Sequence, residues 1–304
     1  MIILNALFPI FGLLALGSLL KYLSLTNEAY LKTSDKLVYY IFFPIMLFWK
    51  VGGAPHGEGD QLAFVLVTLA VLGLMFLIST LVIRFGPIST FQAGSFSQSC
   101  YRFNTYIGVA VILNSLGEAG IAYFGILIAI TIPLVNVFAV ATLIWFSGSD
   151  AGLKQRGVVF VKALVANPLI IGSFCGALYA RMVGGFPEFI DNSLQLMSMV
   201  TLPLALISIG GALSFKGIKK YLGLSLLGSC LKLCVFPLLG FIFYHLFQIQ
   251  GTAFQTGMIF LCLPASTTIY VLSSQLNSDT ELASASIVVS TLLSFISLSV
   301  ALLL

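Results

Sequence analysis

Apolar runs long enough to cross a lipid bilayer recur along the whole chain, and only short polar breaks separate them. A spanning helix needs about 20 largely apolar residues. The runs predict ten spanning helices, at residues 3–21, 35–51, 61–84, 91–116, 121–147, 157–181, 191–213, 219–246, 252–275 and 281–303. Charged residues make up only 8% of the chain, against roughly 25% in soluble domains. The sequence therefore predicts an all-α polytopic membrane protein with ten transmembrane helices and no separate soluble domain.

Positive charges indicate how these helices are oriented. Short cytoplasmic loops collect Lys and Arg, and an uncharged first run followed by Lys21 is typical of a helix inserted with its amino terminus outside. In that orientation ten basic residues fall on the cytoplasmic side and two on the exoplasmic side. The ten are Lys21, Lys32, Lys36, Arg84, Lys154, Arg156, Lys162, Lys216, Lys219 and Lys220, and the two are Lys50 and Arg181. We expect both termini to be exoplasmic, and we assign the net charge of +4 to this sorting instead of to a nucleic-acid surface.

Glycine and proline positions indicate an internal repeat. Pro9, Gly17, Pro44 and Gly52 recur 159 residues later as Pro168, Gly176, Pro203 and Gly211. These residues perturb helices, so four matches at one offset favour a repeat over chance. Each half, 1–148 and 149–304, holds five helices, and an odd number requires the second half to be inserted upside down. Such inverted repeats are typical of secondary transporters.

Two helices carry polar stretches at matching depths. The fourth contains the run SQSCYRFNTYIG (residues 97–108), and the ninth contains LPASTTIY (residues 263–270). Pro264 removes a helix hydrogen bond, and nearby hydroxyl and amide side chains can satisfy the freed backbone. We interpret both stretches as helix breaks that cross near the middle of the membrane and direct half-helix amino termini toward an anion. The alternative is a pair of kinked helices whose polar side chains bind neighbouring helices.

Two positive charges lie inside predicted helices, Arg102 in the fourth and Lys232 in the eighth. Charges at this depth usually face a cavity and serve a function. The ten carboxylates all lie in loops or at helix ends, with Asp35 nearest to the membrane. An uncompensated positive cavity favours an anionic substrate and argues against a buried carboxylate proton relay. Alternatively, Arg102 binds helix carbonyls, and Lys232 snorkels, although either interface is about 20 Å away.

Other polar residues complete the predicted substrate site. Asn104, Thr105, Ser266 and Thr267 could also serve sodium coupling through hydroxyl and carbonyl oxygens, so H⁺ and Na⁺ coupling both stay open. Asn136 and Asn5 are further buried amides, a type that more often joins helices than binds ligands. The predicted substrate-binding set is Arg102, Asn104, Thr105, Pro264, Ser266, Thr267, Lys232, Asn136 and Asn5.

Several motifs resemble the auxin efflux carrier family. They are NALFPIFG (residues 5–12), YYIFFPIMLF (39–48), RFNTYIG (102–108) and LPAS (263–266), and the resemblance runs the whole length of the chain. The short loops are like those of bacterial members, which are similar to malate and malonate permeases, and the PIN auxin exporters of plants are more distant. One departure is that Gly108 is followed by Val109 where many members have a proline, so we expect a milder first break.

The resemblance implies a fold like that of bile-acid symporters and the antiporter NhaA, in which helices 4 and 9 cross at an X-shaped break. Helices 1, 2, 6 and 7 would form a scaffold, through which a homodimer could form, and helices 3–5 and 8–10 a mobile transport unit. Gly108 would act as a hinge, and Pro44 and Pro203 would shape the scaffold wall; Pro44 also predicts a kink in the second helix. A bacterial cytoplasmic membrane is the implied location.

Together these features favour a secondary carrier of a small organic anion over other classes. An auxin-like exporter of the same fold is the alternative within the class. The chain has no GxxxxGK[ST] loop for an ATP-driven pump, and no nucleophile–base pair, metal triad or paired intramembrane carboxylates for a membrane enzyme. A receptor would not need an inverted repeat. The cysteines have no CxxC spacing, and His56 and His245 are too few for a metal cluster, so we expect no metal or other cofactor.

Overall fold

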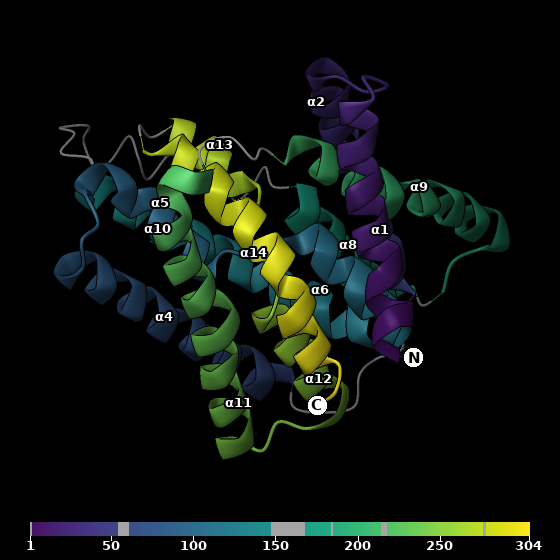
Figure 1. The fold of residues 1–304 in the computed structure, drawn as a ribbon. Coiled ribbons are helices and arrows are strands. Elements are labelled where there is room, and N and C mark those ends of the chain that lie inside the picture. The colour runs from purple at the N-terminus through teal and green to yellow at the C-terminus, as the bar shows by residue number, and fades with distance from the viewer. Residues whose placement is uncertain (1, 54–60, 147–167, 184, 214–217, 276–277) are drawn as a thin grey trace. The chain divides into compact units, whose positions relative to one another are not determined.

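The computed structural model describes residues 2–53, 61–146, 168–183, 185–213, 218–275 and 278–304 (Figure 1). All regular structure in these ranges is helical. The first elements are α1 (Ile2–Tyr22), α2 (Glu28–Leu37), η1 (Val38–Phe42), α3 (Phe43–Gly52), α4 (Gln61–Phe85), α5 (Thr90–Tyr101) and α6 (Thr105–Phe146). The others are α8 (Pro168–Met182), α9 (Glu188–Ala212), α10 (Ile218–Cys230), η2 (Leu231–Val235), α11 (Phe236–Leu246), α12 (Gly251–Leu261), α13 (Thr268–Gln275) and α14 (Thr280–Ala301).

Six stretches of the described chain are long and apolar enough to span a membrane. They are Ile3–Tyr22, Gln61–Phe85, Thr90–Ala139, Glu188–Ala212, Ile218–Leu246 and Thr280–Ala301. The prediction of an all-helical membrane protein is therefore confirmed. The start of the predicted sixth helix, residues 157–167, lies outside the described ranges, as do Lys154, Arg156, Lys162 and Lys216 among the residues used for orientation.

The chain divides into two compact units. Unit 1 consists of Met1–Gly59, Val109–Ile130 and Lys154–Ala212, and unit 2 consists of Asp60–Gly108, Thr131–Leu153 and Leu213–Leu304. The long helix α6 runs through segments of both units, and Gly117 interrupts it with a left-handed φ of 64°. That position is where the sequence predicts the fourth helix to end.

Unit 1 is built on two close helix pairs, α1 with α9 and α3 with α8. Small residues allow the paired backbones to approach each other. A methyl group placed on Gly17 of α1 would overlap the backbone of Ile207 in α9, and one on Gly176 of α8 would overlap the backbone of Phe48 in α3. These glycines are therefore required by packing.

Two π-helical turns each precede a Phe-Pro pair. The turn η1 comes directly before Phe43-Pro44, and η2 comes directly before Phe236-Pro237. A proline has no N–H to donate, and its ring clashes with the carbonyl four residues earlier, so the preceding turn widens. The irregularity that Pro44 predicts in the second helix thus takes the form of a wide turn.

In unit 2, α10, η2 and α11 follow one another along the chain (Figure 1), and α10 and η2 lie beside α14. Helix α5 packs against α4, α10 and α14, and all of it from Ala93 to Tyr101 is buried. This burial places the polar stretch that precedes the first helix break inside the protein. Polar groups there must find partners within unit 2.

Candidate transport site at two helix breaks

The first break separates α5 from α6. Residues 102–104 are not helical, and Arg102 has an extended backbone with φ −68° and ψ 142°. Asn104 caps the new helix, because its side-chain Oδ1 accepts a hydrogen bond of 3.2 Å from the Ile107 amide. Asparagine is one of the favoured residues for this position. The asparagine of the RFNTYIG motif therefore starts the second half-helix.

The second break separates α12 from α13 and is longer, covering residues 262–267. Two serines of α14 satisfy backbone groups that the break frees. Ser290 Oγ accepts a hydrogen bond of 3.1 Å from the Ala265 amide, and Ser297 Oγ donates one of 2.9 Å to the Cys262 carbonyl. Open backbone in a membrane protein requires partners of this kind. The break is thus held open from a separate helix.

The sequence analysis missed Ser290 and Ser297. The signal that could have found them is a stripe of buried serines on α14, an otherwise largely apolar helix. Ser286, Ser290, Ser294 and Ser297 follow one another at spacings of three or four residues and share one face of the helix.

The two breaks meet within unit 2. The Asn104 amide donates a hydrogen bond of 2.9 Å to the Pro264 carbonyl. Beside this bond the rings of Phe103 and Phe260 pack edge to face, with 4.5 Å between their centroids. We call residues 102–104 and 262–267 together the joint. Its central contact connects main chain to main chain.

The amide nitrogen of Asn104 has no hydrogen-bond partner, although Asn104 is only 2% exposed. Its oxygen is committed to capping α6, so the nitrogen is the part of the side chain left for another molecule. Buried polar groups are nearly always paired, and an exception calls for an explanation. A ligand that accepts a hydrogen bond would supply the missing partner.

Arg102 is two residues before Asn104 in the sequence, and its guanidinium donates hydrogen bonds to two side-chain amides. Its Nη1 donates to Gln98 Oε1 at 2.9 Å, and its Nη2 donates to Asn136 Oδ1 at 2.6 Å. These acceptors are neutral, so they orient the guanidinium without cancelling its charge. Asn136 and Arg102, both in the predicted substrate-binding set, are therefore in contact. Gln98, in the same polar run as Arg102, was not among the predicted residues.

Lys232 is completely buried in the π-helical turn η2. Its ammonium lies 3.4 Å from the carbonyl of Leu261, the last residue of α12, and 4.4 Å from the centre of the Phe236 ring. Full burial rules out the snorkelling interpretation. The charge lies just before the second break.

The remaining predicted residues of unit 2 take simpler roles. Thr105 begins α6 and is half-buried, and Gly108 lies within the first turns of that helix, where its amide donates to the Asn104 carbonyl. Ser266 Oγ bonds Thr268 Oγ1 at 2.6 Å and accepts from the Thr268 amide at 3.3 Å, so it caps α13. Thr267 is half-buried in the turn beside it.

Asn5, Pro44 and Pro203 belong to unit 1. Asn5 is exposed on α1, Pro44 begins α3, and Pro203 lies inside α9. The predicted set is therefore divided between the two units, and the expectation that Asn5 is buried is wrong.

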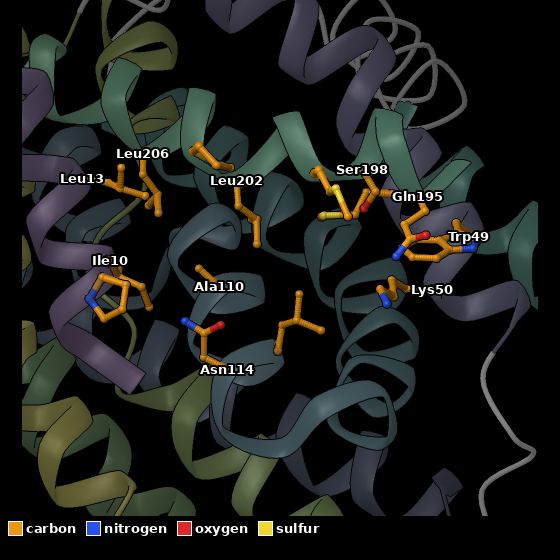
Figure 2. Close-up of a pocket in the computed structure, with 15 residues that line it drawn as sticks. Ile10, Leu13, Trp49, Lys50, Ala110, Asn114, Gln195, Ser198, Leu202 and Leu206 are labelled. Carbon is orange, nitrogen blue, oxygen red and sulfur yellow. The ribbon is translucent and has the colours of Figure 1, made fainter. Parts of the chain in front are cut away.

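Unit 1 contains a pocket of ≈ 370 Å³, lined by residues of α1, α3, α6 and α9 (Figure 2). Most of its lining is apolar, and Lys50, Asn114, Gln195 and Ser198 supply polar groups. The Lys50 ammonium pairs with Glu118 at 2.8 Å and lies 4.0 Å from the centre of the Trp49 ring. The sequence analysis used Lys50 only as an exoplasmic charge and missed this pocket.

Within the described ranges there is no group of three or more His, Cys, Asp or Glu residues that could hold a metal ion. The five cysteines are free thiols.

Long apolar helices, with non-helical segments at residues 102–104 and 262–267, define a polytopic membrane protein. The chain belongs to the family described as membrane transport protein, the auxin efflux carrier family, whose model matches residues 2–302. The resemblance in the motifs is thereby confirmed. Membership also indicates a membrane transporter rather than an enzyme.

Relatives with curated descriptions are named as transporters. A "Putative malonate transporter" of Rhizobium meliloti is 24% identical over 305 residues, which cover 94% of this chain and 90% of the relative. An uncharacterized transporter of Methanothermobacter thermautotrophicus is 24% identical over 289 residues, which cover 94% of this chain and 93% of the relative. An uncharacterized transporter of Methanocaldococcus jannaschii is 27% identical over 193 residues, which cover 63% of this chain and 61% of the relative.

Proposed function

We propose that this protein is a secondary transporter that carries a small organic anion, most simply a carboxylate, across the cytoplasmic membrane. The observation that carries the proposal is the buried, unpartnered amide nitrogen of Asn104 at the joint. Two residues earlier in the chain, Arg102 supplies a guanidinium that donates to the neutral side-chain amides of Gln98 and Asn136. A carboxylate satisfies both groups through charge-assisted hydrogen bonds.

Helix dipoles and a second charge add to the attraction for anions. Asn104 caps the amino terminus of α6, where the helix dipole is positive. Lys232 lies beside the second break, and among the described residues it forms no ion pair with a carboxylate. The name of the Rhizobium relative supports a small dicarboxylate such as malonate as the substrate. An auxin-like export substrate is the alternative.

We propose ten transmembrane helices in two inverted halves, with helices 4 and 9 crossing at the joint. Packing in unit 1 supports the inverted repeat. Gly17 lies against Ile207, and Gly176 lies against Phe48. The offset of 159 residues that relates Gly17 to Gly176 also relates Phe48 to Ile207. A twofold-related pair of contacts is expected of two inverted halves that pack against each other.

Transport would proceed by alternating access, with helices 3–5 and 8–10 moving against a scaffold of helices 1, 2, 6 and 7. Unit 1 contains the described scaffold segments and also Val109–Ile130, which the family resemblance assigns to the moving part. The proposed moving part therefore includes residues that cluster with unit 1, and Gly108 is the last residue before this segment. This position is consistent with a hinge there.

Flux measurements test the proposal. Purified protein in liposomes should accumulate one or more of labelled malonate, malate and indole-acetate above protein-free liposomes, while labelled neutral amino acids serve as the control. Uptake of the neutral solutes alone would reject the anion assignment. Chemical conversion of the solutes by the protein in detergent would point to an enzyme instead.

Thiol labelling tests the orientation. In a cysteine-free background, a cysteine at Lys219 should resist an impermeant reagent added outside the cell, and one at His56 should react. Labelling of both from the outside would contradict the ten-helix arrangement with exoplasmic termini.

A further inference from the structure

Lys232 carries a buried charge that the proposed binding of the substrate does not require. Its ammonium can donate three hydrogen bonds, yet in the described part of the chain it donates to the Leu261 carbonyl alone, at the long distance of 3.4 Å. The Phe236 ring adds a cation–π contact. The side chain is 0% exposed, so this charge stays in the interior, where burying a charge is costly. A charge buried at such a cost usually serves a function.

The position of the Lys232 ammonium at the end of α12 indicates what this function is. The last carbonyls of a helix have no partner within it, and they carry the negative end of the helix dipole. Leu261 ends α12, and two of the next three carbonyls accept hydrogen bonds from other partners. Ser297 donates to the Cys262 carbonyl, and the Asn104 amide donates to the Pro264 carbonyl. Lys232 therefore supplies the positive charge at the carboxyl end of a broken helix.

In secondary transporters with broken helices, unwound carbonyls and half-helix carboxyl ends are where coupling cations bind. We propose that Lys232 is a tethered cation that takes the place of a coupling sodium ion at the end of α12, so that transport does not require Na⁺. The part of the proposal that concerns Na⁺-independent transport rests on the proposed carrier function. Its structural part, a cation site at the Leu261 carbonyl, does not depend on which solute is carried.

The same geometry distinguishes this role from direct contact with the substrate. The ammonium faces a carbonyl oxygen and an aromatic ring face, both of which attract cations. A carboxylate placed there would be repelled by both. Lys232 therefore acts on the backbone of the break, and its charge helps the substrate only through the electric field at the joint.

A substrate-free experiment tests the cation site. Lys232→Ser removes the charge, leaves space and adds an oxygen ligand. In choline buffer its Tm should fall by at least about 4 °C, and saturating Na⁺ or methylammonium should restore it. The wild type and Lys220→Ser, a change at an exposed lysine near the start of the same predicted spanning helix, should show no such response to either cation.

If Lys232→Ser cannot be purified in choline, Na⁺ during extraction should recover folded protein. A Tm unchanged by the substitution, or a loss that neither cation reverses, would overturn the proposal. In the flux assay, replacing external Na⁺ by choline should leave wild-type anion uptake unchanged, and dependence on Na⁺ would likewise overturn it. Absence of any anion uptake would instead reject the carrier function and leave the thermal result to decide the cation site.

Discussion

The side chain of Asn104 caps α6 and, in our proposal, donates to the substrate, and a single substitution separates these two roles. Its oxygen caps α6 through the Ile107 amide, while its nitrogen has no partner. Asn104→Asp keeps an oxygen for the cap, and Asp is as good an N-cap as Asn. The new carboxylate sits at the positive end of the helix dipole, which favours it. The variant loses only the donor that we assign to the substrate.

The expected magnitude follows from the nature of that bond. A hydrogen bond to a charged group contributes about 1.5–3 kcal/mol, which corresponds to an affinity loss of about 10- to 150-fold. Repulsion between the new carboxylate and an anionic ligand adds to this loss. Asn104→Ser keeps the cap and the neutral charge, so its affinity should fall by the hydrogen-bond part alone. Both variants should keep a Tm close to that of the wild type.

Titration of purified protein with malonate, followed by calorimetry, measures the affinities, and a thermal melt in detergent measures the cap. Should Asn104→Asp bind the anion as tightly as the wild type, the nitrogen is not a ligand donor and the main argument for the site fails. A large fall in the Tm of both variants would show instead that the amide nitrogen stabilises the joint itself.

Three further outcomes are expected. Ser290→Ala leaves a main-chain amide in the second break without a partner and should cost about 1–3 kcal/mol, whereas Ser299→Ala, on the exposed face of the same helix, should change the melting curve little. Gly17→Ala forces a methyl group into a neighbouring backbone and should destabilise the protein by about 1–3 kcal/mol. Gly12→Ala on the same helix meets nothing within 4 Å, so equal losses for the two in denaturation would refute the packing argument. Arg102→Lys keeps the charge but not the two-amide grip, and it should weaken malonate binding about tenfold with a smaller effect on the Tm; unchanged affinity would assign Arg102 a structural role.

The sequence predicted those parts of the fold that depend on local composition. Apolar runs of sufficient length set the helix positions, and the polar run at residues 97–108 marked the first break because polar side chains are costly in lipid. Gly108 without a following proline predicted a milder first break, and the structure has three non-helical residues there against six in the second break.

The partners that hold the site could not be predicted in the same way. Ser290 is 25 residues from the amide it binds, and Lys232 is 29 residues from its carbonyl partner. Serine is common in membrane helices and usually bonds its own helix backbone, as Ser294 does. Nothing local distinguishes the serine that serves a distant break from one that does not. Tertiary geometry is needed to tell them apart.

The contact between the two breaks, from the Asn104 amide to the Pro264 carbonyl, is made of main chain on both sides. Every amino acid except proline offers that amide, and every residue offers that carbonyl. Sequence drift can therefore exchange side chains around the contact without abolishing it. A deep mutational scan would under-report its importance, since only proline at position 104 deletes the donor. Replacement of that peptide bond by an ester would reveal it.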